Sequence, residues 1–172
     1  MPVKPGKANA PFKANAPGKA GAKEGPSVAT VIDAMAGDDG RIMSMAQGLG
    51  LALPGADERT VYDGFCREWT PAYYLAKRQI FHVHVFKSGI RGSMFVGVRA
   101  LEPLIMASCQ APGNIKDIVA NTRGGSGAKM IKALLATNED VAGFGNLVRV
   151  RWEFELERLG PAAAVPGGVP GG

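Results

Sequence analysis

Residues 80–99, IFHVHVFKSGIRGSMFVGVR, contain two alternating stretches separated by a turn. Apolar and polar side chains alternate in residues 80–86 and again in residues 93–99, and Lys87-Ser88-Gly89 between them is a typical turn sequence. Alternation with a period of two indicates a strand with one buried face. Two such strands joined by a short turn predict an antiparallel hairpin. The side chains expected on its buried face are Phe81, Val83, Val85, Met94, Val96 and Val98.

The longest alternation lies near the C-terminus, in residues 147–158, LVRVRWEFELER. Five apolar side chains alternate there with charged ones, which predicts a long strand with one buried face. Residues 138–146 contain turn-forming residues. The apolar stretch before them, residues 129–137, is therefore interpreted as the hairpin partner of the last strand, with a helix over 129–137 as an alternative.

The other segments between residues 27 and 127 have weaker patterns. Residues 27–35 can begin a helix with Ser27 as its N-cap, and residues 115–121 suit a short helix. Residues 57–69 carry acids at their start and could form one helix, whereas residues 41–53 are ambiguous between helix and strand. These assignments favour a helix-decorated, mainly β barrel, with α+β as the alternative.

Charge is distributed unevenly along the 172 residues. The formal net charge is +5, and residues 1–26 hold five lysines against Glu24 alone, a net +4. The same segment contains five prolines, and the unit Lys-Ala-Asn-Ala-Pro occurs at 7–11 and at 13–17. With so little apolar surface to bury, we expect a disordered arm. Nucleic acid is the first partner expected for its charge, an acidic membrane surface is second, and a solubilising tail or linker is the alternative.

Three regions follow from this composition: a disordered basic arm at 1–26, a β-rich domain at 27–159, and a flexible Gly/Pro/Ala tail at 160–172. No apolar run approaches the roughly 20 residues that a membrane span requires. No apolar segment follows the N-terminal lysines, which argues against a signal peptide. Cys66 and Cys109 are too few for a disulfide framework, and we expect them to be buried thiols.

The residues with catalytic or ligating chemistry do not form a recognisable motif. His82 and His84 share one face of the predicted strand and could begin a metal site, but the sequence does not identify a third or fourth ligand. The run Arg123–Lys129, RGGSGAK, lacks the spacing of a phosphate-binding loop and is interpreted as a flexible loop. We therefore expect a protein that is not an enzyme, with no catalytic residues, no metal and no cofactor.

Taken together, the basic arm, the β-rich body and the terminal stretch GNLVRVRWEFEL (145–156) followed by Pro161 resemble the jelly-roll coat proteins of small icosahedral positive-strand RNA viruses or satellite viruses. Residues 65–98 contribute to this resemblance, which covers about residues 59–161. It implies an antiparallel jelly-roll-like β-barrel or sandwich with short helices. The genome-facing charges that it implies are Lys4, Lys7, Lys13, Lys19 and Lys23.

A second resemblance leads to the same kind of protein. Arg59-Thr-Val61 with Phe65, Trp69 and Pro71, and later Leu101–Leu104, is similar to part of the rod-shaped tobamovirus coat proteins, which are helix bundles. Both resemblances imply a coat protein that self-assembles into a homo-oligomeric shell and packages RNA without sequence readout, independently of membranes. They also imply location in the virion, and in the host cytoplasm during assembly. A cellular RNA- or ribosome-associated structural protein with a basic tail is the alternative.

Overall fold

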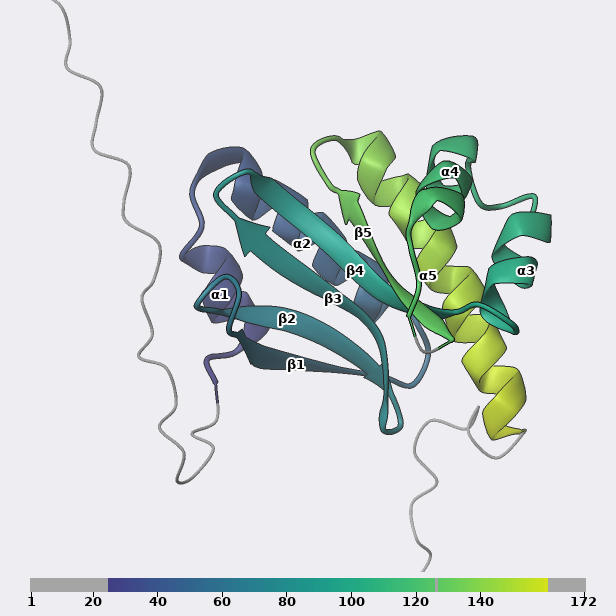
Figure 1. Cartoon of the computed structure of the whole chain (residues 1–172). Coiled ribbons are helices and arrows are strands. Elements are labelled where there is room, and N and C mark those ends of the chain that lie inside the picture. The colour runs from purple at the N-terminus through teal and green to yellow at the C-terminus, as the bar shows by residue number, and fades with distance from the viewer. Residues whose placement is uncertain (1–24, 126, 161–172) are drawn as a thin grey trace, which may run out of the picture.

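A computed structural model describes residues 25–125 and 127–160, and these residues form five strands and five helices. The strands are β1 (Ala56–Asp63), β2 (Glu68–Leu75), β3 (Arg78–Phe86), β4 (Gly89–Gly97) and β5 (Ala128–Leu134). They pair antiparallel in the order β1-β2-β3-β4-β5, so each strand lies beside its neighbour in the chain. Among the described strands the sheet is open, with β1 and β5 at its edges (Figure 1).

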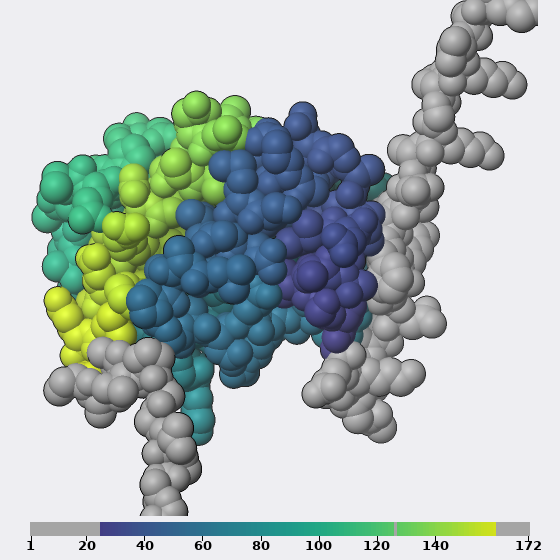
Figure 2. Space-filling model, turned by 180° about the vertical axis from the view of Figure 1, so that it is seen from behind, coloured from purple at the N-terminus to yellow at the C-terminus, as the bar shows by residue number. Residues whose placement is uncertain are grey.

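The helices are α1 (Val28–Asp33), α2 (Gly37–Leu51), α3 (Leu101–Ala107), α4 (Gly113–Asn121) and α5 (Asn138–Leu159). Helices α2 and α5 lie on the same face of the sheet, behind it in Figure 1. Figure 2, seen from that side, shows α1, α2 and α5 covering the strands. No described helix lies over the opposite face, which we call the open face of the sheet. None of the described helices is long and apolar enough to cross a membrane.

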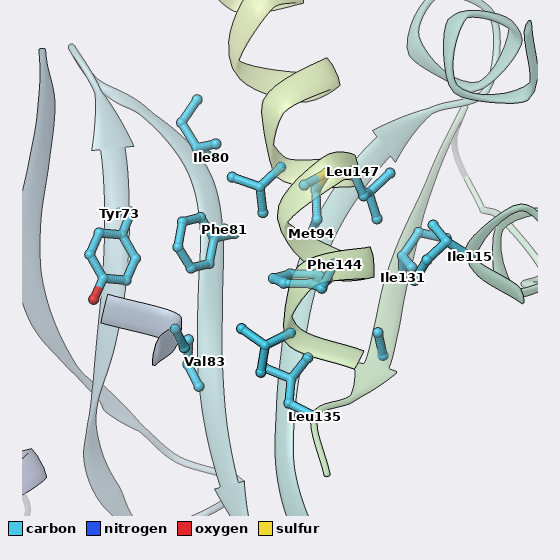
Figure 3. Packing of buried hydrophobic residues seen from close by; sticks show 14 of the residues in the cluster. Tyr73, Ile80, Phe81, Val83, Met94, Ile115, Ile131, Leu135, Phe144 and Leu147 are labelled. Atoms are coloured by element: carbon cyan, nitrogen blue, oxygen red, sulfur yellow. The ribbon is translucent and has the colours of Figure 1, made fainter. Parts of the chain in front are cut away.

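The hydrophobic core lies between the sheet and the two long helices (Figure 3). Phe144 of α5 contacts Phe81 of β3 edge to face, with ring centres 5.8 Å apart. Phe81 in turn stacks on Tyr73 of β2 at 4.4 Å. Gly92 permits this close packing, because a Cβ atom there would lie 2.5 Å from the Phe144 ring. The three aromatic rings are fully buried and fix the distance between sheet and helix.

The central hairpin was predicted correctly. Strands β3 and β4 pair antiparallel around a tight turn, with His82 opposite Ser93 and His84 opposite Arg91. Of the six side chains expected on the buried face, Phe81, Val83, Met94 and Val96 are buried, Val85 is partly buried and Val98 is exposed. The helices expected at 27–35 and 115–121 are also present, and Ser27 caps α1 by accepting a hydrogen bond from the Thr30 N–H.

The strand predicted at 147–158 is wrong, because these residues belong to the 22-residue helix α5. Thr137 and Asp140 form a capping box that starts this helix nine residues before the alternation begins. The buried side chains Val141, Phe144, Leu147 and Val148 then follow spacings of three and four, which form one face of a helix. The charged residues Arg151 and Glu155, read as the polar face of a strand, form an i,i+4 ion pair on the helix.

Two further assignments need correction. The helix suggested for 57–69 is instead β1, a turn and the start of β2. The strand expected at 129–137 exists as β5, but it pairs with β4 and not with the C-terminal segment. The α+β alternative is therefore the observed arrangement, and the described residues form neither a closed barrel nor a helix bundle. The jelly-roll expectation relied on the misassigned C-terminal strand.

Candidate functional site

A cluster of polar side chains lies on the open face of the sheet, near the end where the β1–β2 and β3–β4 turns are located. Phe81 and Val83 point into the core, so strand alternation directs His82 and His84 to the open face. The two imidazole rings are 4.1 Å apart. This confirms the prediction that the histidines share a face.

The fold supplies partners that the sequence did not identify. Asp63, at the end of β1, hydrogen-bonds with His84 Nδ1, and His84 Nε2 lies 2.6 Å from Ser93 Oγ on β4. The Asp63 carboxylate also accepts hydrogen bonds from the Phe65 N–H and from Cys66 Sγ, at 2.9 and 3.2 Å. In addition, Thr70 Oγ1 lies 2.6 Å from His82 Nε2. Asp63, His84, Ser93 and Thr70 are all buried.

Burial and hydrogen bonding shift the protonation of this cluster. Burial, together with the neighbouring His84, lowers the pKa of His82 to about 4. Burial alone would raise the pKa of Asp63, but its hydrogen bonds from His84, Phe65 and Cys66 outweigh burial and lower it. Burial and the Asp63 carboxylate raise the pKa of the Cys66 thiol to about 12. Near neutral pH the cluster thus contains an ionised Asp63, a neutral His82 and a protonated Cys66.

The chain Asp63–His84–Ser93 has the connectivity of a nucleophile, a base and an orienting carboxylate. Ser93, however, is buried, and the cavity that it lines together with both histidines has a volume of only about 40 Å³. That space accommodates a water molecule and not an acyl substrate. We therefore interpret these hydrogen bonds as a satisfied polar network and not as a hydrolase site.

Aromatic and cationic side chains surround the polar cluster. Phe86 stacks on His84 with ring centres 5.7 Å apart. Lys132 Nζ of β5 lies 6.0 Å from the Phe86 ring centre and 5.7 Å from that of Phe65, and Arg91 Cζ lies 5.8 Å from Phe86. Phe65, in the β1–β2 turn, is 84% exposed. We call the surface formed by Phe65, Phe86, Arg91 and Lys132, at one end of the open face, the cation–aromatic surface.

A groove of about 780 Å³ adjoins this surface. Neighbouring residues such as Val85 and Phe86, which point to opposite faces of β3, both line it, so it passes around the end of the sheet. Its aromatic lining consists of Phe65, Trp69 and Phe86. Its apolar wall on the helix side includes Val31 of α1 and Met35, which follows α1. Its charged lining is mixed: Lys87, Asp39 and Glu68.

The first described residues enter the fold beside this groove. Thr60 Oγ1 donates a hydrogen bond to the Pro26 carbonyl at 2.7 Å, and Gly25 packs so tightly on the Trp69 ring that a Cβ atom would lie 2.5 Å from it. The basic segment is thus joined to the domain at a residue that lines the groove. The lysines predicted to bind nucleic acid, Lys4, Lys7, Lys13, Lys19 and Lys23, lie outside the described residues, as does the tail from 161.

Other sequence predictions have mixed outcomes. Lys129 of the glycine-rich run is buried at the start of β5, where Nζ contacts Glu102 and the Val119 carbonyl at 2.8 and 2.7 Å, so it is not available to a phosphate. The expectation of two buried thiols is wrong, since Cys66 is partly buried and Cys109 is exposed. Sequence reasoning did not find Asp63, Cys66 or the groove. The available signal was the run Asp63-Gly-Phe-Cys-Arg67, in which Asp63 and Cys66 are three positions apart and Gly64 suits a turn.

Comparisons with known proteins do not extend this description. No family model, no curated protein and no solved structure matches the chain. A function is therefore inferred from the basic segment, the groove and the cation–aromatic surface.

Proposed function

We propose that this chain is a structural, self-associating coat protein that packages single-stranded RNA. In this proposal, the lysines of residues 1–24 neutralise phosphates, and the groove holds bases against Phe65, Trp69 and Phe86. The observation that carries it is the contact between Gly25 and Trp69, because it joins the basic segment to the aromatic groove. Such a protein would be located in the virion, and in the host cytoplasm during assembly. The jelly-roll topology of the icosahedral coats is not part of the proposal.

Physical chemistry supports single-stranded RNA as the partner. Stacking of a base on an aromatic side chain contributes about 1–3 kcal/mol and needs no particular base. Lysine contacts with phosphate add affinity through counterion release, again without sequence readout. Lys87, Lys132 and Arg91 supply positive charge around the rings, although Asp39 and Glu68 offset part of it. Duplex RNA keeps its bases stacked and cannot use the groove in this way.

The first prediction concerns Phe65, whose exposure makes it replaceable without loss of core packing. We expect Phe65→Ala to weaken binding of a fluorescently labelled oligouridylate by about 5- to 100-fold, the loss of one stacked base. The matched control is Leu51→Ala, which removes an apolar side chain that is 66% exposed on α2 and should leave affinity unchanged. Fluorescence polarisation measures both. Equal affinities of the two variants for the oligouridylate would show that the groove takes no part in RNA binding.

Deletion of residues 2–24 tests the basic segment in the same assay. It leaves Gly25 and Pro26 in place, so the contacts with Trp69 and Thr60 are kept and the domain should still fold. We expect the magnitude of the slope of log affinity against log salt to fall by about 3, because the deletion removes five lysines and Glu24, a net charge of +4. Full RNA affinity after deletion would show that the arm has no part in packaging.

A further inference from the structure

We propose that Asp63, His82, His84 and Cys66 form a binding site for one divalent transition-metal ion of the Zn²⁺ class. Ligand atoms of Asp63, His82 and His84 lie within 4.8 Å of one another. A tetrahedral zinc ion with bonds of about 2.0–2.3 Å separates neighbouring ligand atoms by about 3.3–3.6 Å. Small side-chain rotations therefore bring these donors to coordinating distance. The site does not depend on the RNA-packaging function proposed above.

Cys66 supplies the fourth donor after a movement of its side chain. Its Sγ atom lies 3.2 Å from Asp63 Oδ2, slightly closer than two ligands of one ion usually lie. Sγ does not belong to the group of donors that lie within 4.8 Å of one another, so the thiol must move towards the imidazoles to bind the same ion. The turn that carries it connects β1 to β2, and Arg67, the next residue, has φ = 58°, a left-handed conformation that tightens the turn. Cys66 also lines the groove, which gives an ion a path from solvent to Asp63 and His84, the buried members of the cluster.

Outer hydrogen bonds orient the two imidazoles. Ser93 Oγ lies 2.6 Å from His84 Nε2, which directs Nδ1 towards Asp63. Thr70 Oγ1 holds His82 through Nε2 at the same distance. Metal-bound histidines generally have such a partner on the second ring nitrogen, because it fixes the ring and raises the basicity of the ligand. Both histidines thus have hydroxyl partners suited to a supporting role.

Charge and donor type select the kind of ion. Two imidazoles with one thiolate and one carboxylate suit Zn²⁺ or Co²⁺, whereas Mg²⁺ and Ca²⁺ prefer oxygen ligands alone. A dication bound to the anionic forms of Asp63 and Cys66 makes the cluster neutral overall, which reduces the electrostatic cost of burying it. The ion would join the end of β1, the β1–β2 turn and β3, and thereby brace the rim of the groove.

Spectroscopic titration tests the site. Untagged full-length protein is treated with a chelator, desalted under reducing conditions and titrated with Co²⁺, then with Zn²⁺. We expect one equivalent of Co²⁺ to produce the visible bands of tetrahedral coordination and a near-ultraviolet thiolate-to-metal band, and Zn²⁺ to abolish both. Saturating Zn²⁺ should raise the midpoint of thermal unfolding by several degrees, because the ion binds only the folded chain.

Matched variants identify the ligands. Cys66→Ser should lose the thiolate band and bind Co²⁺ at least about 10-fold more weakly. Cys109→Ser, which removes the exposed cysteine, should behave like the parent protein. His82→Asn should also lose binding, with circular dichroism used to establish that it remains folded. No saturable uptake by the parent protein, or uptake unchanged in both Cys66→Ser and His82→Asn, would overturn the proposal; if His82→Asn does not fold, comparison of the two cysteine variants decides.

Discussion

At the residue scale, burial controls the chemistry of the open face more than formal charge does. His82 and His84 are adjacent in the strand alternation, yet the structure gives them different partners, Thr70 for one and Asp63 with Ser93 for the other. Hydrogen bonds to side chains from three strands replace the water that these groups lose. A polar cluster of this kind is stable only while its partners stay in place.

The lowered pKa of His82 predicts a loss of stability in mild acid. The folded chain resists protonating this ring until about pH 4, whereas the unfolded chain takes up the proton near pH 6.5. As the pH falls from 6.5 towards 4, the unfolded state therefore binds more protons and unfolding becomes easier. We expect the free energy of unfolding at pH 4.5 to be lower than at pH 7 by about 2–3 kcal/mol from this residue.

Urea denaturation at several pH values, with a chelator present throughout, measures this effect. His82→Asn keeps a polar side chain near Thr70 but cannot titrate, so its stability should depend less on pH across this window. Asp63 affects the pH dependence of stability only at lower pH than His82 does, because the pKa of its carboxyl lies below the ordinary value of 3.8. An identical pH dependence in the variant and the parent protein would contradict the assignment to His82.

At the element scale, α5 is the helix on which the fold depends most, and its C-terminal half is held by a buried ion pair. Glu155 is 1% exposed and contacts Arg151 one turn earlier at 3.0 Å and Arg78 of β3 at 3.1 Å. The Glu155–Arg78 contact joins the helix to the start of a central strand. Removal of the Glu155 charge leaves the largely buried Arg151 guanidinium with the Phe95 carbonyl but without its carboxylate partner.

We expect Glu155→Gln to lower the free energy of unfolding by about 3 kcal/mol or more, the usual cost of breaking a buried ion pair. The same substitution at Glu153, which is exposed on the same helix, should change it by no more than about 0.5 kcal/mol. Urea unfolding followed by circular dichroism compares the two. Equal stabilities would mean that α5 is held by its apolar face alone.

The elements differed in how far sequence could predict them. The β3–β4 hairpin was predictable because alternation and turn residues agree within twenty residues. Helix α5 was misassigned because LVRVRWEFELER satisfies a period of two over a short window. The informative residues lay upstream, where the Thr137–Asp140 capping box precedes Val141, Phe144 and Leu147 at helical spacing. A window that began at Thr137 would have favoured the helix.

At the scale of the whole molecule, the sheet has one face covered by helices and one face left open. Phe95, Met130 and Leu134 lie on the open face and are 36–50% exposed. They lie on β4 and β5, beside the cation–aromatic surface formed with Lys132. Apolar and cationic side chains thus share one surface of the domain, which is the kind of surface that the proposed RNA-packaging coat protein would need.

Sedimentation velocity tests the proposal that the chain is a coat protein. We expect the purified 17.9 kDa chain to form large, uniform particles when single-stranded RNA is added. Treatment with ribonuclease before mixing is the control for RNA dependence, and electron microscopy shows the particle shape. A chain that remains monomeric at high concentration with RNA would favour the cellular RNA-associated alternative.

Much of the candidate site could not be predicted because its members are distant in the chain. The pairing of β1 with β2 and β2 with β3 brings Asp63 to His84, which is 21 positions away. The sequence indicated that His82 and His84 share a face, but it could not specify which other side chains would reach them. The groove likewise combines residues of α1, α2, β2 and β3 with residues of the β1–β2 and β3–β4 turns.

Sequence alone determined the features that depend on neighbours within a few positions: the central hairpin, the Ser27 cap, the shared face of the two histidines and the concentration of positive charge in residues 1–26. Tertiary structure alone decided that helices cover one face of the sheet and that Asp63 and Cys66 join the histidines. The reason is physical. Local sequence patterns are compatible with more than one structure. The structure that forms is the one in which the apolar faces of distant elements pack together, here around Phe81 and Phe144.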